Sequence, residues 1–289
     1  MNILLGIIST FFESFWDAFR KKALDLSTLW KNTFAMAWPI MWALMVYWVI
    51  STYWSDFKIF WDYSIILITL LVVILEIITN YLYMYVFKKV KISHLLPYDN
   101  LDKLLVVIIW FFIFTWTQAE TTLTTLLITI FTIIIIILFS IDFKTLKISK
   151  NILLYILALS LNAVTTLIIW YILLKYSTID YMSINVIITF ILYLLLALLF
   201  RENIKDSFKQ KKEFYKPRLY SLLLNWSSFI IWLYIIETAW VIIATLISFI
   251  AIITSIIAYK FILNDSPEKK DIILAIIVTI LIWIWYYFK

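Results

Sequence analysis

The sequence contains no cysteine and only one histidine, His94. The absence of cysteine excludes disulfides, thiolate metal ligands and cysteine nucleophiles. A single histidine argues against a zinc site built from histidines, and the chain has no paired-histidine or Ser–His pattern. The sequence therefore predicts no catalytic residues, no metal, no cofactor and no enzymatic activity.

Glycine occurs once, at Gly6. Close contacts between membrane helices often use glycine. We therefore expect Ala, Ser and Thr to fill these contacts, as in the run ALSLNAVTT at 158–166.

Charged residues are also scarce: they make up 15% of the 289 residues, whereas 65% are hydrophobic. A soluble protein of this size needs far more charge on its surface. The few charges cluster in short connections between long apolar runs, which is typical of a multi-pass membrane protein. The net charge of +6 is therefore interpreted as a topology signal, and no motif indicates nucleic-acid binding.

The apolar runs predict an all-α polytopic membrane protein with ten transmembrane helices in a single domain, residues 1–289. The longest connection, 201–218, is too short and too basic to be a folded domain. The predicted spans are 3–19, 33–52, 64–87, 95–116, 121–140, 151–174, 184–200, 219–236, 239–262 and 271–288.

The two halves of the chain resemble each other. The first and sixth spans both begin Asn-Ile-Leu-Leu, which places Glu13 opposite Asn162, and a second register places Asn80 opposite Asn225. We interpret this as a duplicated five-helix unit, and because five is odd the second copy must be inverted in the membrane. The predicted repeats are residues 1–146 and 147–289.

The most informative residue is Glu76, in the middle of the apolar run 64–87. An ionised side chain there costs several kcal/mol or takes up a proton, so an acid inside a membrane is a functional hypothesis by default. Asn80 and Tyr83 follow on the same helical face. We predict that the three line a polar cavity in which Glu76 carries a proton or binds substrate. The alternative is a protonated Glu76 that only hydrogen-bonds a neighbouring helix.

The first span carries Glu13, Asp17 and Arg20 at positions i, i+4 and i+7. Asp17 and Arg20 are close enough to pair, so we interpret them as the polar end of a short span. Glu13 lies deeper and is a candidate for substrate binding or proton coupling.

Polar residues also mark the start of the fourth span. Pro97 cannot donate a backbone hydrogen bond and so begins or kinks this helix. Asp99 and Asn100 are candidate cavity residues. Alternatively, Asp99 forms an i, i+4 ion pair with Lys103, or the segment is a solvated loop. The remaining candidates for substrate binding are Asn162, Asn225 and Trp226, with Trp16 and Trp110 as further aromatic walls.

The length, the ten spans and the two five-helix halves resemble the drug/metabolite transporter superfamily, in its ten-helix EamA-type branch. The closest likeness is the segment KISHLLPYDN through ILFSID, 91–142, with Pro97 at the head of the fourth span and Glu120 after it. The later copy has Ile242 in place of the proline, and the glycines that are frequent in the family's fifth and tenth spans are missing from this sequence. The resemblance implies alternating access, and Glu13 is similar in position to the first-helix acid of the small multidrug resistance branch.

Lysine and arginine are distributed unequally between the connections: 20 lie in the odd-numbered connections and 3 in the even-numbered ones and the C-terminal tail. The positive-inside rule predicts that the odd connections face the cytoplasm and that both termini face outward. The family resemblance implies the reverse orientation, with both termini inside.

Acids outnumber bases among the buried candidates, which favours a cationic or zwitterionic solute over an anion. The sequence thus predicts a secondary active transporter in the inner cell membrane, a monomer or homodimer, whose partners are a small-molecule substrate, the lipid bilayer and protons. The alternatives are a lipid-carrier flippase and a non-transporting membrane scaffold.

Overall fold

The computed structural model is helical, and no strand occurs among the residues it describes. These residues are 2–26, 41–42, 45–46, 49, 58–99, 101–114, 123–140, 149–200, 212–238, 251–269, 272–273, 276–277 and 280–281. The α-helices are α1 (Asn2–Leu26), α3 (Tyr63–Lys89), α4 (Leu101–Phe114), α5 (Leu123–Ser140), α6 (Lys150–Leu173), α7 (Thr178–Leu199), α9 (Lys212–Thr238) and α11 (Ala251–Leu263). Two short 3-10 helices are η1 (Lys58–Trp61) and η2 (Ile92–Tyr98).

Four of these helices are long and apolar enough to cross a membrane: Tyr63–Lys89, Lys150–Leu173, Thr178–Leu199 and Glu213–Ile236. Helix α3 also presents an apolar outer face, because Leu67, Leu71, Ile74 and Ile78 are all at least 40% exposed. A helix that is apolar on its exposed side as well as its buried side suits a lipid environment. The chain is therefore a multi-pass membrane protein.

Three predicted helix starts are wrong. The fourth span was predicted to begin at 95, with Pro97 at its head, but Pro97 lies in η2 and α4 begins at Leu101. Helices α7 and α9 begin earlier than 184 and 219, at Thr178 and Lys212. In α7, the Ser177 hydroxyl caps the first turn, accepting from the Asp180 N–H at 3.2 Å. In α9, polar and basic residues form the first turns. A prediction from hydropathy alone assigns such turns to a loop.

Spans 33–52 and 271–288 lie largely outside the described residues, as does the first half of 239–262. Helices α1, α3, α5 and α6 cover the predicted spans 3–19, 64–87, 121–140 and 151–174 to within a few residues, except that α1 extends to Leu26.

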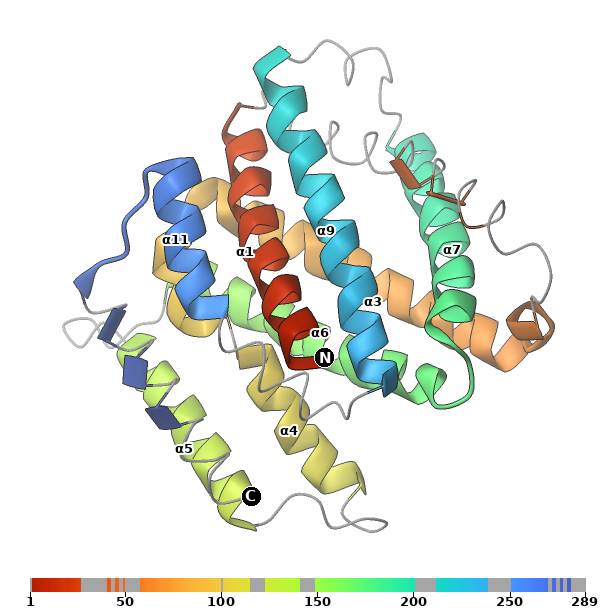
Figure 1. Cartoon of the computed structure of the whole chain (residues 1–289), viewed down its shortest axis with the longest axis horizontal. Coiled ribbons are helices and arrows are strands. Elements are labelled where there is room, and N and C mark those ends of the chain that lie inside the picture. The colour runs from red at the N-terminus through yellow and green to blue at the C-terminus, as the bar shows by residue number, and fades with distance from the viewer. Residues whose placement is uncertain are drawn as a thin grey trace.

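Helix α1 packs between α9 and α11 (Figure 1). It runs antiparallel to α9 and parallel to α11. The contacts that show these directions are Ser9–Ser228 and Phe19–Tyr220 for α9, and Ser14–Thr254 and Lys22–Ile262 for α11.

Helix α6 has the corresponding pair of neighbours, because it packs against α3 and α4. It runs antiparallel to α3 and parallel to α4. The contacts are Tyr155–Tyr83 and Tyr176–Asp62 along α3, and Tyr155–Asp99 and Asn162–Asp102 along α4.

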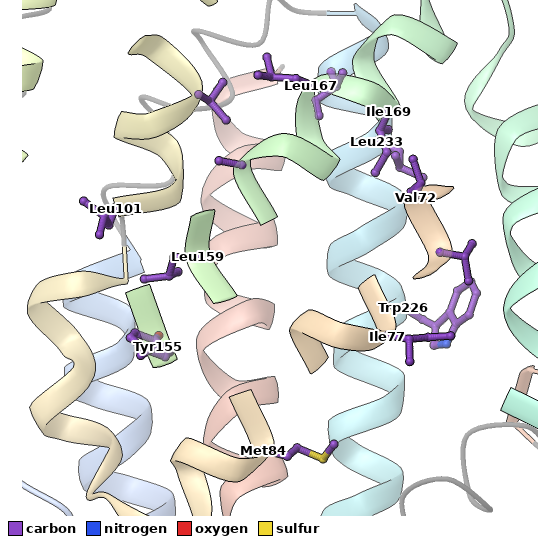
Figure 2. Packing of buried hydrophobic residues seen from close by; sticks show 14 of the residues in the cluster. Val72, Ile77, Met84, Leu101, Tyr155, Leu159, Leu167, Ile169, Trp226 and Leu233 are labelled. Carbon is purple, nitrogen blue, oxygen red and sulfur yellow. The ribbon is translucent and has the colours of Figure 1, made fainter. Parts of the chain in front are cut away.

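A single cluster of buried apolar side chains joins these helices, with members from α3, α6 and α9 in one region (Figure 2). Trp226 of α9 is 6% exposed and meets Trp42 edge-on, with ring centroids 4.5 Å apart. Small and hydroxyl residues fill the closest helix contacts, as predicted: Ser9 bonds Ser228, and Ser14 bonds Thr254 at 2.7 Å.

The helix directions bring many of the described basic residues together at one end of the bundle, although Lys58 and Lys175 lie at the other end. This basic end comprises the ends of α1, α3 and α11 and the starts of α6 and α9, with Lys21, Lys22, Lys88, Lys89, Lys150, Lys216 and Lys260. The count of lysine and arginine by connection included Arg20 and Arg218, but both side chains are buried in the structure.

Candidate functional site

A cavity of about 240 Å³ lies where α1, α3, α4, α6, α7 and α9 meet. Every predicted site residue that the structure describes lines it, whereas Asn100 lies outside the described residues. These lining residues are Glu13, Glu76, Asn80, Tyr83, Asp99, Asn162, Asn225 and Trp226. The predicted stripe Glu76–Asn80–Tyr83 on α3 therefore faces a polar hollow, and its role in binding stays a prediction.

Arg20 of α1 is fully buried on the cavity wall, so the interpretation of Arg20 and Asp17 as the polar end of a span is wrong. Its Nη2 donates to both the backbone carbonyl and the side-chain Oδ1 of Asn80, each at 3.2 Å. Its Nη1 lies 4.0 Å from Asp17 Oδ1. Helix α1 continues to Leu26, seven residues beyond the predicted end of its span, and this extension carries Arg20 inside the bundle.

Three aromatic rings surround the Arg20 guanidinium. Its Cζ lies 5.2 Å from the ring centroid of Trp16, 5.6 Å from that of Phe87 and 5.9 Å from that of Tyr83. A planar cation gains electrostatic attraction from such faces, and the gain grows when water is excluded. The cage and Asn80 together explain how a cation is held here.

Lys103 of α4 holds together a cluster of acids. Its Nζ donates to Asp102 Oδ2 at 2.9 Å and lies 3.9 Å from Glu13 Oε1. Asn162 of α6 donates to the same Asp102 oxygen at 2.7 Å. The predicted Asp99–Lys103 pair is wrong, because Asp99 lies before the first turn of α4 and accepts a 2.7 Å hydrogen bond from the Tyr155 hydroxyl.

Glu76 faces α7 across the cavity. Asn185 Nδ2 donates to Glu76 Oε2 at 3.5 Å and to the Tyr181 hydroxyl at 2.9 Å. Sequence reasoning missed Asn185 because it placed the start of this helix at residue 184. The capping pattern Ser177-Thr-Ile-Asp180 could have revealed the true start, since a serine followed three residues later by an acid marks a helix N-terminus.

The cavity lining contains five acids and two bases. The acids are Glu13, Asp17, Glu76, Asp99 and Asp102, and the bases are Arg20 and Lys103. An excess of carboxyl groups over basic groups in a region of low dielectric favours a solute with a positive group or hydrogen-bond donors. Within the described part of the chain, no three His, Cys, Asp or Glu side chains are grouped to hold a metal ion.

No protein-family model and no curated protein matches this chain. The assignment of a function therefore depends on the geometry of the cavity.

Proposed function

We propose that this protein is a secondary transporter that carries a small cationic or zwitterionic metabolite across the membrane by alternating access. The observation that carries the proposal is the acid-rich cavity, which is lined in part by the four apolar helices of membrane length. A buried charged cavity destabilises a purely structural bundle, because each ion must be removed from water. Such groups inside membrane proteins typically mark pathways for ions or solutes.

The size of the cavity favours a small solute. Pockets for drug-sized ligands occupy roughly 300–1,000 Å³. The cavity here, at about 240 Å³, is below that range. A metabolite of amino-acid or small-amine size fits better than a bulky drug.

The neighbours of α1 and α6 support a pair of inverted five-helix repeats, because each of these helices packs on two helices of the opposite half of the chain. This reciprocal packing is an exchange of partners between the halves. Helix α1 runs antiparallel to α9 and parallel to α11, and α6 stands in the same relation to α3 and α4. An inverted duplication produces this exchange, with the binding site at the interface of the repeats. It is also the arrangement expected of a ten-helix carrier of the drug/metabolite transporter type.

We place the protein in the inner cell membrane with its basic end in the cytoplasm, following the positive-inside rule. Proton coupling through Glu13 or Glu76 belongs to the proposal as well. Both carboxyl groups face the cavity, where either could exchange a proton for a cationic solute.

Solute counterflow in liposomes tests the proposal, because exchange needs no knowledge of the driving ion. A thermal-shift screen of purified protein against amine and zwitterionic metabolites first identifies a stabilising compound. Liposomes loaded with that compound should then accumulate its labelled form. We expect Glu13→Gln to weaken exchange by about tenfold, because it removes one carboxylate from the cavity.

The matched control is Glu213→Gln, since Glu213 is exposed at the start of α9. The proposal fails if no compound is exchanged, or if Glu13→Gln and Glu213→Gln behave alike.

A further inference from the structure

The wall of the cavity between α3 and α7 carries buried oxygen atoms that lack partners. Thr79 Oγ1, Asn185 Oδ1 and Thr189 Oγ1 accept and donate no hydrogen bond within the described part of the chain. The exposed fractions of these residues are 4%, 0% and 3%, and all three line the cavity. Buried polar groups are normally hydrogen-bonded, so three orphans on one wall indicate a missing ligand.

The directions of α3 and α7 indicate how these side chains follow one another along the cavity. Helices α3 and α7 run parallel, because Tyr176 meets Asp62 near their starts and Asn185 meets Glu76 farther along. Thr79 lies three residues after Glu76, and Thr189 four residues after Asn185. Each hydroxyl thus sits one helical turn, about 5.4 Å, beyond the Glu76–Asn185 contact. All four side chains line the cavity from α3 and α7, and this part of the cavity is called the slot.

The chemistry of the slot selects a cation. The Asn185 amide nitrogen is already used, since it donates to Tyr181 and Glu76, so the amide presents only its oxygen. The slot therefore offers one carboxylate, one amide oxygen and two hydroxyl oxygens. Oxygen ligands suit hard cations, and a single carboxylate balances the charge of a monovalent ion but not that of a divalent ion. Arg20 bonds the neighbouring Asn80, and its positive charge is partly balanced by the Asp17 carboxyl group beside it.

We infer that Glu76, Asn185, Thr79 and Thr189 form a binding site for a monovalent alkali cation, for which sodium is the probe. A role of this cation as the coupling ion of transport rests on the proposed function, whereas the binding of the cation does not. The slot opens into the cavity that holds the Lys103 cluster, so an ion there adds positive charge beside the solute site. In this arrangement Glu76 binds the cation, and Glu13 is left as the proton-exchanging acid.

Equilibrium binding of radioactive sodium to the purified full chain in detergent tests the inference. We expect saturable binding that sodium chloride displaces and choline chloride, at equal concentration, does not. Thr189→Val keeps the shape of the side chain but removes its oxygen, and should weaken sodium binding by about tenfold. Thr189→Ser keeps the hydroxyl and should bind as the unchanged protein does.

Thr166→Val is the matched control, because Thr166 lines the same cavity from α6. It should leave sodium binding unchanged. The inference is overturned if binding is not saturable, if choline competes equally, or if Thr166→Val and Thr189→Val have the same effect. Sodium binding without counterflow would reject the proposed transport but keep the site, whereas counterflow without sodium binding would reject the site alone.

Discussion

Buried charge is the dominant feature at the scale of single residues. Arg20 and Lys103 are the two basic side chains on the cavity wall, and each is held by a different kind of contact. Arg20 lies within an aromatic cage and bonds an amide, whereas Lys103 lies among carboxylates. The first contact depends on the planar shape of the guanidinium, and the second depends mainly on charge.

Replacing Arg20 by Lys should destabilise the protein even though the charge is kept. An ammonium group cannot stack on the three rings while bonding Asn80 at two oxygens. We expect the free energy of unfolding to fall by about 1–2 kcal/mol, measured as a lower thermal unfolding midpoint in detergent. Lys260→Arg, at an exposed position near the end of α11, is the control. Equal midpoints for Arg20→Lys and the unchanged protein would contradict the role of the cage.

Removing the hydroxyl of Tyr155 should likewise destabilise the bundle. Tyr155→Phe deletes the 2.7 Å hydrogen bond to Asp99 and leaves that carboxyl without its donor from α6. Removing one partner of a buried hydrogen bond costs about 1–3 kcal/mol, and we expect a loss of this size. Tyr171→Phe provides the control, because Tyr171 is 48% exposed on the same helix. Similar unfolding midpoints for the two variants would refute this contribution.

At the scale of the element, the start of α3 shows how one side chain can fix a helix end and join it to its neighbours. Helix α3 begins at Asp62, whose side chain accepts hydrogen bonds from the N–H groups of Ser64 and Ile65. The same carboxyl accepts a 2.9 Å hydrogen bond from the Tyr176 hydroxyl, in the connection between α6 and α7. One side chain therefore caps α3 and ties it to the neighbouring helix pair.

The Asp62 cap should make stability depend on pH. The hydrogen bond from the Ser64 side chain, followed by that from Tyr176, lowers the pKa of Asp62 below its ordinary value of 3.8. A lowered pKa in the folded state means that the stabilisation is complete above the ordinary pKa and is lost as the pH falls through the folded value. Asp62→Asn keeps an acceptor but cannot ionise. We expect it to be less stable than the unchanged protein at pH 7, with the difference shrinking toward pH 3.

Thermal unfolding of both proteins across this pH range is the measurement. A constant difference between them from pH 7 to pH 3 would show that ionisation of Asp62 does not contribute.

At the scale of the whole molecule, contacts between the two halves of the chain close the basic end of the bundle. Asn264 adopts the left-handed conformation, with φ of 52°, and the Asp265 N–H returns to the Tyr259 carbonyl at 3.2 Å, which ends α11. This turn aims the Asp265 carboxylate at η2, where it accepts hydrogen bonds from the Ser93 N–H at 3.2 Å and hydroxyl at 2.8 Å. Asp265, in the second half of the chain, thereby caps η2, which belongs to the first half.

The proposed alternating access requires the basic end to open, so under this proposal the contact should break during transport. Because the chain has no cysteine, Ser93→Cys with Asp265→Cys introduces the only two thiols. A short bis-methanethiosulfonate cross-linker, which attaches to each thiol through a disulfide, should join them and stop counterflow of the exchanged solute, and cleavage of these disulfides by a reductant should restore it. Each single variant, treated in the same way, is the control. Full exchange by the cross-linked protein would show that this end does not move.

The sequence by itself determined the membrane setting and the polar face of α3. Both follow from local patterns: apolar runs of membrane length, and the spacing of Glu76, Asn80 and Tyr83 along one helix. Only the tertiary structure decided the partners. Arg20 meets Asn80, Lys103 meets Glu13, and Asn185 meets Glu76 through the packing of helices distant in the chain. Helical periodicity states which residues share a face, but the neighbour of that face depends on how whole helices pack, and no short stretch of sequence encodes this.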